Sequence, residues 1–157
     1  MTILVISDSH GKTVSVKNLL DKYTRTANLV IHLGDHADDI LRYTSDFSHL
    51  TIAAVSGNVD GYRAPIERII TLNERKILLT HGHVQDVKSG LDRLIFYAIE
   101  RQVDVCLFGH THEPVSFVHD GIFFMNPGSL GAPRPGGRAG YGLITLGSAV
   151  EGRLLPL

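Results

Sequence analysis

Short, largely apolar runs followed within a few residues by polar side chains recur five times in the first 112 residues. Runs of this kind are typical of strands covered on both faces, as in a parallel sheet. Apolar residues at helical spacing follow two of them, from Val16 to Tyr23 and from Val87 to Ile99. This alternation predicts an α/β architecture with a mainly parallel sheet. The runs are Ile3–Ile6, Leu29–Leu33, Thr51–Val55, Lys76–Thr80 and Val103–Leu107.

Hairpin signals become dense in the second half of the chain. Val115–Val118 and Ile122–Met125 flank His119-Asp120-Gly121, a strong turn sequence, and Leu143–Leu146 pairs in the same way with Val150–Leu155. Ile66–Leu72 and Lys76–Thr80 form an earlier hairpin. We therefore expect a second sheet, built from hairpins and packed on the first, within a single domain of residues 1–157.

Composition excludes several classes of protein. The formal net charge of -1 gives no sign that a nucleic acid or an acidic membrane is recruited by bulk charge. The one cysteine, Cys106, excludes a disulfide framework. No apolar run approaches the ~18 residues of a membrane span, and no basic leader precedes the first strand. We expect a cytoplasmic protein, and its oligomeric state stays open.

The polar residues that follow the five runs are candidates for one site. In open α/β sheets, ligands bind outside the carboxyl ends of the strands, where these side chains would meet. A glycine lies within three positions of each, which allows tight turns and close approach of the backbone to a ligand. The candidates are Asp8, His10, Asp35, Asn58, His81, His110 and His112.

The residue types indicate metal binding. Four imidazoles, two carboxylates and one amide are nitrogen and oxygen donors that suit first-row transition metals. Seven donors exceed the needs of one ion and suit two ions that share a carboxylate. Two divalent ions ~3.5–4 Å apart can hold a phosphoryl group and make hydroxide available near neutral pH.

Five motifs in this order resemble those of the calcineurin-like metallophosphoesterase superfamily. The compact length and Asn126-Pro127-Gly128-Ser129 are similar to its small stand-alone phosphodiesterase branch. The resemblance implies a two-sheet sandwich flanked by helices, the four-layer αββα fold. The motifs are Asp8-Ser9-His10, Gly34-Asp35, Gly57-Asn58, His81-Gly82 and Gly109-His110-Thr111-His112.

The resemblance also implies how the ligands are shared. One ion is expected on Asp8, His10, Asp35 and His112, and a second on Asp35, Asn58, His81 and His110, with Asp35 bridging. Asp35, Asn58 and His110 are the residues implied in catalysis. Mn²⁺ is the first choice of cofactor, with Ni²⁺, Fe²⁺ or Zn²⁺ as alternatives.

The activity implied is that of a binuclear metal-dependent phosphoesterase. A metal-bridging hydroxide would hydrolyse a small phosphodiester in line. The alternative is a non-catalytic scaffold, as in the retromer subunit that shares this fold. A scaffold need not keep every ligand, so the full set of seven favours the enzyme.

One position departs from the family pattern. Many relatives carry a histidine after the metal-binding asparagine, where it contacts the phosphate and assists the leaving group. This chain has Val59 there, so a general acid from the protein is in doubt.

Other polar residues have competing interpretations. His36 and His83 neighbour ligands, so each is either a supporting or substrate-contacting residue or a solvated turn residue. His32 lies inside an apolar run, which favours a hydrogen-bonded core histidine. Asp60-Gly61 is interpreted as a turn, and Arg134 and Arg138 as mainly solvent-facing, with phosphate binding as the alternative.

Overall fold

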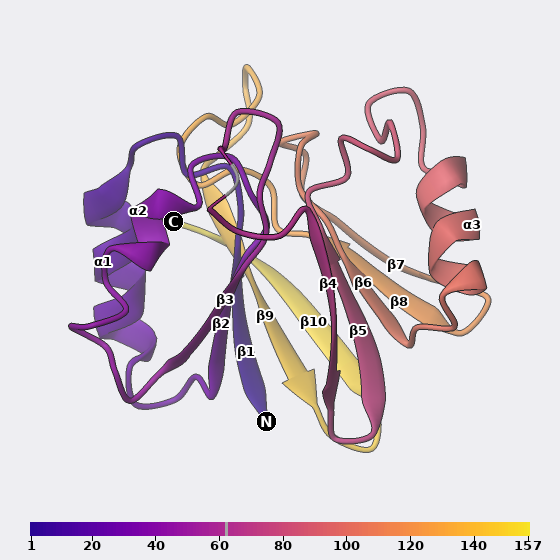
Figure 1. Cartoon of the computed structure of the whole chain (residues 1–157), viewed down its shortest axis with the longest axis horizontal. Helices are drawn as coiled ribbons and strands as arrows, with labels where there is room; N and C mark the ends of the chain where they lie inside the picture. The colour runs from indigo at the N-terminus through magenta and orange to yellow at the C-terminus, as the bar shows by residue number, and fades with distance from the viewer. Residues whose placement is uncertain (62) are drawn as a thin grey trace.

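The computed structural model describes residues 1–61 and 63–157 and contains two five-stranded sheets packed face to face (Figure 1). The first sheet has the order β10-β9-β1-β2-β3. Strands β1, β2 and β3 are parallel, and β3 lies at the edge. Strand β9 pairs antiparallel with the other side of β1, with Val5 opposite Gly142. The strands are β1 (Thr2–Ile6), β2 (Leu29–His32), β3 (Thr51–Ala54), β9 (Gly140–Leu146) and β10 (Val150–Pro156).

The second sheet has the order β4-β5-β6-β8-β7. Strands β5, β6 and β8 are parallel, whereas β4 and β7 pair antiparallel at the two edges. The strands are β4 (Glu67–Leu72), β5 (Arg75–Thr80), β6 (Val105–Leu107), β7 (Val115–His119) and β8 (Ile122–Asn126).

The division of strands between the sheets differs from the sequence-based expectation. The hairpin of β9 and β10 extends the first sheet, and the parallel strands are shared between both sheets. Turn residues identify a hairpin, but they do not specify which sheet edge accepts it. That choice depends on which edge is free, and here β1 has an unpaired side that β9 fills.

Helices cover the outer face of each sheet (Figure 1). The helices α1 (Thr13–Tyr23) and α2 (Asp38–Leu41) lie on the first sheet, and α3 (Asp92–Glu100) lies on the second. The apolar stripe predicted to start at Val87 is helical only from Asp92. Val87 is buried, but it lies in a turn that precedes the helix. The result is the expected four-layer αββα arrangement.

Alternation along β1 explains the layering, because successive side chains of a strand point to opposite faces. Ile3 and Val5 pack between the sheets, against Leu79 and Leu107 of the second sheet. Leu4 and Ile6 point the other way, into the cluster that contains the buried side of α1. A strand covered on both faces therefore needs consecutive apolar residues, and Ile3–Ile6 provides them.

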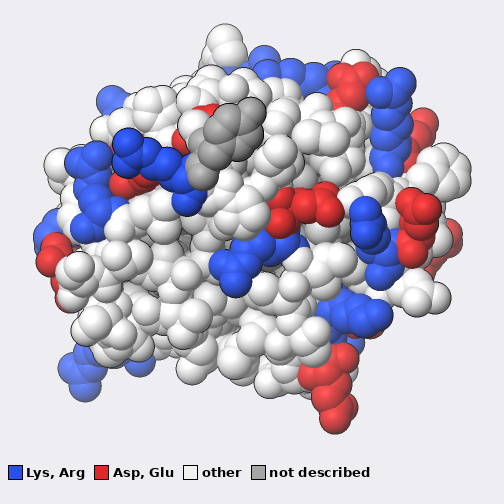
Figure 2. All heavy atoms as spheres, in the orientation of Figure 1, with Lys and Arg blue, Asp and Glu red and all other residues white. Residues whose placement is uncertain are grey.

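The distribution of charge and the length of the helices match the composition. Lys and Arg side chains are interspersed with Asp and Glu on the face shown in Figure 2. Among the described residues, no helix is both long and apolar enough to span a membrane.

Candidate metal centre

The loops that follow β1, β2, β5 and β6 bring six of the seven predicted ligands together. Their ligand atoms form two groups, and within each group these atoms all lie within 4.8 Å of one another. The first group is Asp8, His10, Asp35 and His112, and the second is Asp35, His81 and His110. Asp35 is shared between the groups, as the resemblance implied for a bridging ligand.

The two carboxylate oxygens of Asp35 face different groups. Oδ1 lies 3.3 Å from Nε2 of His81, whereas Oδ2 lies 3.8 Å from Nε2 of His10. The backbone N–H of Val59 donates to Oδ1 at 3.3 Å, which helps to fix the plane of the carboxylate. One carboxylate held between two groups of nitrogen donors can serve both.

Asp8 has a buried oxygen without a hydrogen-bond donor. Its Oδ2 accepts hydrogen bonds from Ser7 Oγ at 2.5 Å and from the backbone N–H of His110 at 3.2 Å. Its Oδ1 is buried, and no described residue donates a hydrogen bond to it. Burial of an unsatisfied carboxylate oxygen is costly, so this atom indicates a place for a cation.

Backbone carbonyl groups orient two of the histidines. Nδ1 of His81 lies 2.7 Å from Leu33 O, and Nδ1 of His112 lies 2.5 Å from Ala132 O. A carbonyl only accepts, so both Nδ1 atoms carry the proton, and in the neutral rings the Nε2 lone pairs point into the site. Outer hydrogen bonds of this kind are typical of histidines that bind metals.

The inward-facing Nε2 atoms of His81 and His112 lie close to further ligand atoms. Nε2 of His112 lies 3.0 Å from Asp8 Oδ1 and 3.4 Å from Nε2 of His10. Nε2 of His81 lies 3.1 Å from Nδ1 of His110. Each cluster therefore brings together ring nitrogens and carboxylate oxygens that a bound cation could share. The donor set thus fits two transition-metal ions.

Most of the ligands have left-handed backbones. The φ angles of Asp8, His10, Asp35, His110 and His112 lie between 43° and 69°. Asp and His tolerate this region better than most residues, yet sparsely populated conformations cost of order 1–3 kcal/mol each. Such outliers cluster at functional sites, where the surrounding structure holds them.

Two glycines allow the ligand loops to approach each other. A Cβ added to Gly57 would collide with Asp35 Oδ1, and one added to Gly109 would collide with Ser7 Oγ and lie 2.9 Å from Asp8 Oδ2. Both clashes involve groups that hold or form the site. Gly57 and Gly109 are therefore needed for close packing of the ligand loops.

The charges of the site shift its pKa values in a consistent way. Burial opposes ionisation of Asp35, but hydrogen bonding to His81 and its positive charge outweigh it and hold the pKa of Asp35 well below its usual range. Burial also disfavours the charged form of His81, yet Asp35 and Asp8 raise its pKa. Burial and the charge of His81 lower the pKa of His110 to about 4.

Asn58 is the one amide among the predicted ligands, and it lies in the loop after β3. It follows β3 at the same end of the first sheet, but its side chain is exposed. It lines a cavity of about 260 Å³ together with His83, Ile66 and the loop that contains Gly57 and Asp60. Its roles as ligand and catalytic residue therefore stay predictions.

His36 and His83 lie beside ligands. The His36 ring is 5.3 Å from that of His10, and the His83 ring is 5.5 Å from that of His81. Nδ1 of His83 is buried, and no described residue forms a hydrogen bond with it. His83 thus combines access to the cavity with an unused polar atom.

Several supporting residues were missed by the sequence reasoning. Asp60, interpreted as a turn residue, accepts hydrogen bonds from the backbone N–H groups of His36 at 2.8 Å, Ala37 at 3.0 Å and Gly57 at 2.8 Å. It thereby ties the Asp35 loop to the Asn58 loop. Asn126 donates to Gly109 O at 2.8 Å and so supports the His110–His112 turn. The Asp-Gly and Asn-Pro-Gly sequences signalled turns but not these long-range bonds.

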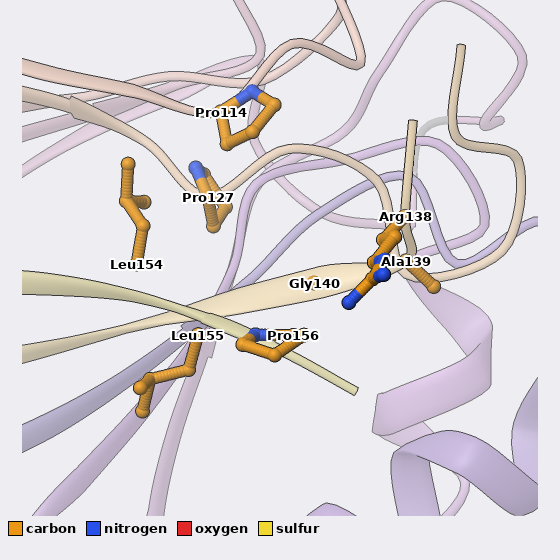
Figure 3. Close-up of a pocket in the computed structure, with 8 residues that line it drawn as sticks. All are labelled: Pro114, Pro127, Arg138, Ala139, Gly140, Leu154, Leu155 and Pro156. Carbon is orange, nitrogen blue, oxygen red and sulfur yellow. The ribbon is translucent and has the colours of Figure 1, made fainter. Parts of the chain in front are cut away.

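The two arginines have different environments. Nε of Arg134 donates to Thr111 O at 2.8 Å, so this side chain braces the turn between two ligands and is half exposed. Arg138 lines another cavity, of about 200 Å³, with Pro114, Pro127 and residues 154–156 (Figure 3). Neither contact supports the phosphate-binding alternative.

Comparisons with known proteins show the family of this chain. The family model described as the calcineurin-like phosphoesterase superfamily domain matches residues 1–149. The "Probable metallophosphoesterase YsnB" of Bacillus subtilis is 34% identical over 147 residues, which cover 93% of this chain and 85% of that protein. The "Phosphodiesterase YfcE" of Escherichia coli K12 is 28% identical over 92% of this chain and 87% of its own length.

A solved structure and a eukaryotic relative complete the comparison. A crystal structure from Streptococcus pneumoniae TIGR4, described as that of a predicted phosphoesterase, has a TM-score of 0.81 and 33% identity and covers 96% of this chain and 87% of its own. "Vacuolar protein sorting-associated protein 29" of Schizosaccharomyces pombe is 34% identical over 85% of this chain and 74% of its own length. By its fold, its ligand groups and these matches, the chain belongs to the calcineurin-like phosphoesterase superfamily.

Proposed function

We propose that this protein is a binuclear metal-dependent phosphodiesterase. The observation that carries the proposal is the position of Asp35, whose two oxygens face two separate groups of nitrogen donors. The buried Asp8 Oδ1, which receives no hydrogen bond from a described residue, supports a cation in the first group. Mn²⁺ is the proposed ion, with Ni²⁺, Fe²⁺ and Zn²⁺ as alternatives.

The chain's own residues prepare this chemistry. Two divalent ions would supply positive charge for the phosphoryl oxygens and activate a water molecule for in-line attack. His81 and His112 are held by carbonyl groups, so their lone pairs are oriented before any ion binds. Asp35 and Asp8 have lowered pKa values and stay ionised at neutral pH. Preorganisation of this kind lowers the cost of binding ions and substrate.

The neighbouring cavity favours a diester over a monoester. Near neutral pH a phosphodiester carries one negative charge, whereas a phosphomonoester carries almost two. The described residues that line the cavity beside Asn58 include no Lys or Arg to balance a second charge. Asn58 and His83 can instead contact a neutral leaving group, with Ile66 as an apolar wall. The relative named as a phosphodiesterase supports the same class of substrate.

A non-catalytic scaffold is the second candidate. The relative named for vacuolar protein sorting supports it. The enzyme is favoured because six predicted ligands lie together and carbonyl groups orient the Nε2 atoms of His81 and His112 into the site.

A substrate and metal screen tests the proposal. Chelator-treated protein would be reloaded with Mn²⁺, Ni²⁺, Fe²⁺ or Zn²⁺ and assayed with bis(p-nitrophenyl) phosphate, p-nitrophenyl phosphate and cyclic nucleotides. We expect metal-dependent diester hydrolysis that Asp35→Asn abolishes, whereas His119→Ala, a change of an exposed histidine at the end of β7, has no effect. Full-length folded protein that binds no ion and hydrolyses none of these esters would support the scaffold.

A further inference from the structure

A chain of hydrogen bonds joins three buried side chains next to the first group of ligands. His32 lies at the end of β2, Ser9 lies between two ligands, and Asp39 lies in α2. The side chains of all three are buried. His32 was expected to be a hydrogen-bonded core histidine, and it is one, but its partners belong to the ligand loops.

The direction of each hydrogen bond follows from its end groups. The backbone N–H of Gly34 donates to Nδ1 of His32 at 3.2 Å, so this nitrogen carries no proton. Nε2 of His32 therefore carries the proton and donates to Ser9 Oγ at 2.9 Å. The hydroxyl of Ser9 in turn donates to Asp39 Oδ2 at 2.8 Å, which is nearer than the alternative acceptor, His36 O, at 3.3 Å. Asp39 Oδ2 also accepts from the backbone N–H of Gly11 at 2.7 Å.

The contacts of this chain fall on one group of ligands. Ser9 separates Asp8 from His10, and Gly11 follows His10. Gly34 immediately precedes Asp35. None of its hydrogen bonds reaches the loops that carry His81 and His110. Three of the four first-group ligands are thus adjacent to atoms that His32, Ser9 and Asp39 hold.

We infer that His32 is a positioning residue for the first metal position. By bonding to Gly34 and Ser9 at once, it sets the spacing between the loop after β1 and the loop after β2. Both loops have left-handed backbones at their ligands, so they need outside support to stay in place. The inference rests on the proposed binuclear centre. A purely structural His32 would affect the stability of the protein but not one metal position more than the other.

Metal titrations of matched variants test the inference. His32→Leu removes the acceptor and the donor, Ser9→Ala breaks the chain in its middle, and His32→Gln keeps one acceptor and one donor. Val30→Ala is the control, because Val30 is buried on the same face of β2 and its truncation leaves a cavity without touching the polar chain. Each folded protein would be titrated with Mn²⁺ by equilibrium dialysis and by electron paramagnetic resonance, which separates a spin-coupled pair from isolated ions.

The expected result is a selective loss. In His32→Leu and Ser9→Ala, one of the two ions should bind about 10–100-fold more weakly, the usual effect of losing a supporting hydrogen bond. The coupled signal should then give way to that of isolated Mn²⁺, and His32→Gln should restore part of it. Val30→Ala should keep both ions and the coupled signal, although urea unfolds it more easily.

The outcomes separate this inference from the proposed function. Unmodified protein that binds fewer than two ions would overturn the binuclear proposal. Unmodified protein with two ions, together with variants that weaken both equally or no more than Val30→Ala does, would overturn the role of His32 alone. If His32→Leu does not fold, Ser9→Ala and His32→Gln still show whether one ion is weakened selectively.

Discussion

Nε2 of His112 lies 3.0 Å from Oδ1 of Asp8, and these two residues follow strands of different sheets. Asp8 follows β1 of the first sheet, and His112 follows β6 of the second. His81 and Asp35 meet across the same boundary at 3.3 Å. The ligand groups therefore join the two sheets at one end of the sandwich.

Metal binding should consequently stabilise the whole protein. Free Mn²⁺ at 100 times the dissociation constant should raise the free energy of unfolding by about 2.7 kcal/mol per ion, if the unfolded chain binds none. Urea titrations with Mn²⁺ and with a chelator measure this gain. Asp35→Asn should remove most of the gain for both ions, and His112→Ala for one. An identical gain in Asp35→Asn would contradict the shared role of Asp35.

Hydrolysis should invert the configuration at phosphorus. The nucleophiles that could form a covalent intermediate are poorly placed: Cys106 is buried in β6, and the Ser9 hydroxyl is engaged with Asp39. Direct attack by water gives one inversion, whereas a covalent intermediate gives two and net retention. A phosphorothioate diester chiral at phosphorus, hydrolysed in ¹⁸O-labelled water, reports the outcome.

Val59 should make the rate sensitive to the leaving group. Its side chain is 55% exposed near the site and has no proton to give, while its backbone N–H is bonded to Asp35. General acid catalysis is typically worth ~10²–10⁴-fold, so diesters with alkyl leaving groups should react slowly. In a series of aryl and alkyl diesters, the rate should fall steeply as the pKa of the leaving group rises.

Variants at the same position provide the control. Val59→His should flatten the dependence if the imidazole reaches the leaving oxygen, and Val59→Leu should leave it steep. A flat dependence in the unmodified protein would instead indicate a resident acid, and His83 in the adjacent cavity would be the first residue to replace.

The stability of the metal-free protein should fall as the pH is lowered from 6.5 to 4. Burial lowers the pKa of His32 from 6.5 to about 4, against the opposing charges of Asp8, Asp60 and Asp39. Between pH 6.5 and 4, His32 is protonated in the unfolded chain but stays neutral in the folded protein. The loss should reach about 3 kcal/mol for His32 alone, since one pKa unit is worth about 1.4 kcal/mol.

A comparison of variants isolates this contribution. His110 and His83 also have lowered pKa values and add to the loss, whereas His81 and His112 have raised ones and add none below pH 6.5. Urea unfolding at several pH values should therefore give a shallower slope for His32→Gln than for the unmodified protein. Parallel slopes would show that His32 is protonated in the folded state.

The local elements were predictable because they depend on near-neighbour patterns, whereas the four layers were expected from the resemblance to the family. The all-apolar β1 and the helical stripe of α1 require cover on particular faces, and the structure supplies it. The placement of β9 beside β1 depends on contacts across most of the chain, which no local pattern encodes. That is why the division of strands between the sheets was wrong.

The candidate site was predictable as a set of residues but not as a supported structure. The Asp and His residues at strand ends were expected to lie together, because carboxyl ends of parallel strands meet at one edge, and six of them do. The roles of Asp60 and of the hydrogen-bonded chain from His32 to Asp39 depend on turns that bring distant N–H groups together. A buried histidine in an apolar strand was the one signal that could have indicated the second of these.

The buried, unsatisfied oxygen of Asp8 has a consequence for how such proteins diverge. Its Oδ1 receives no hydrogen bond from a described residue and its backbone is left-handed, features that suit a bound ion. Asparagine also tolerates positive φ and would carry no charge into the interior. We expect Asp8→Asn to leave the metal-free fold intact, because the amide oxygen can still accept the hydrogen bonds that Oδ2 accepts. A descendant released from selection for catalysis could thus lose the first metal position by one substitution and retain the fold for a different function.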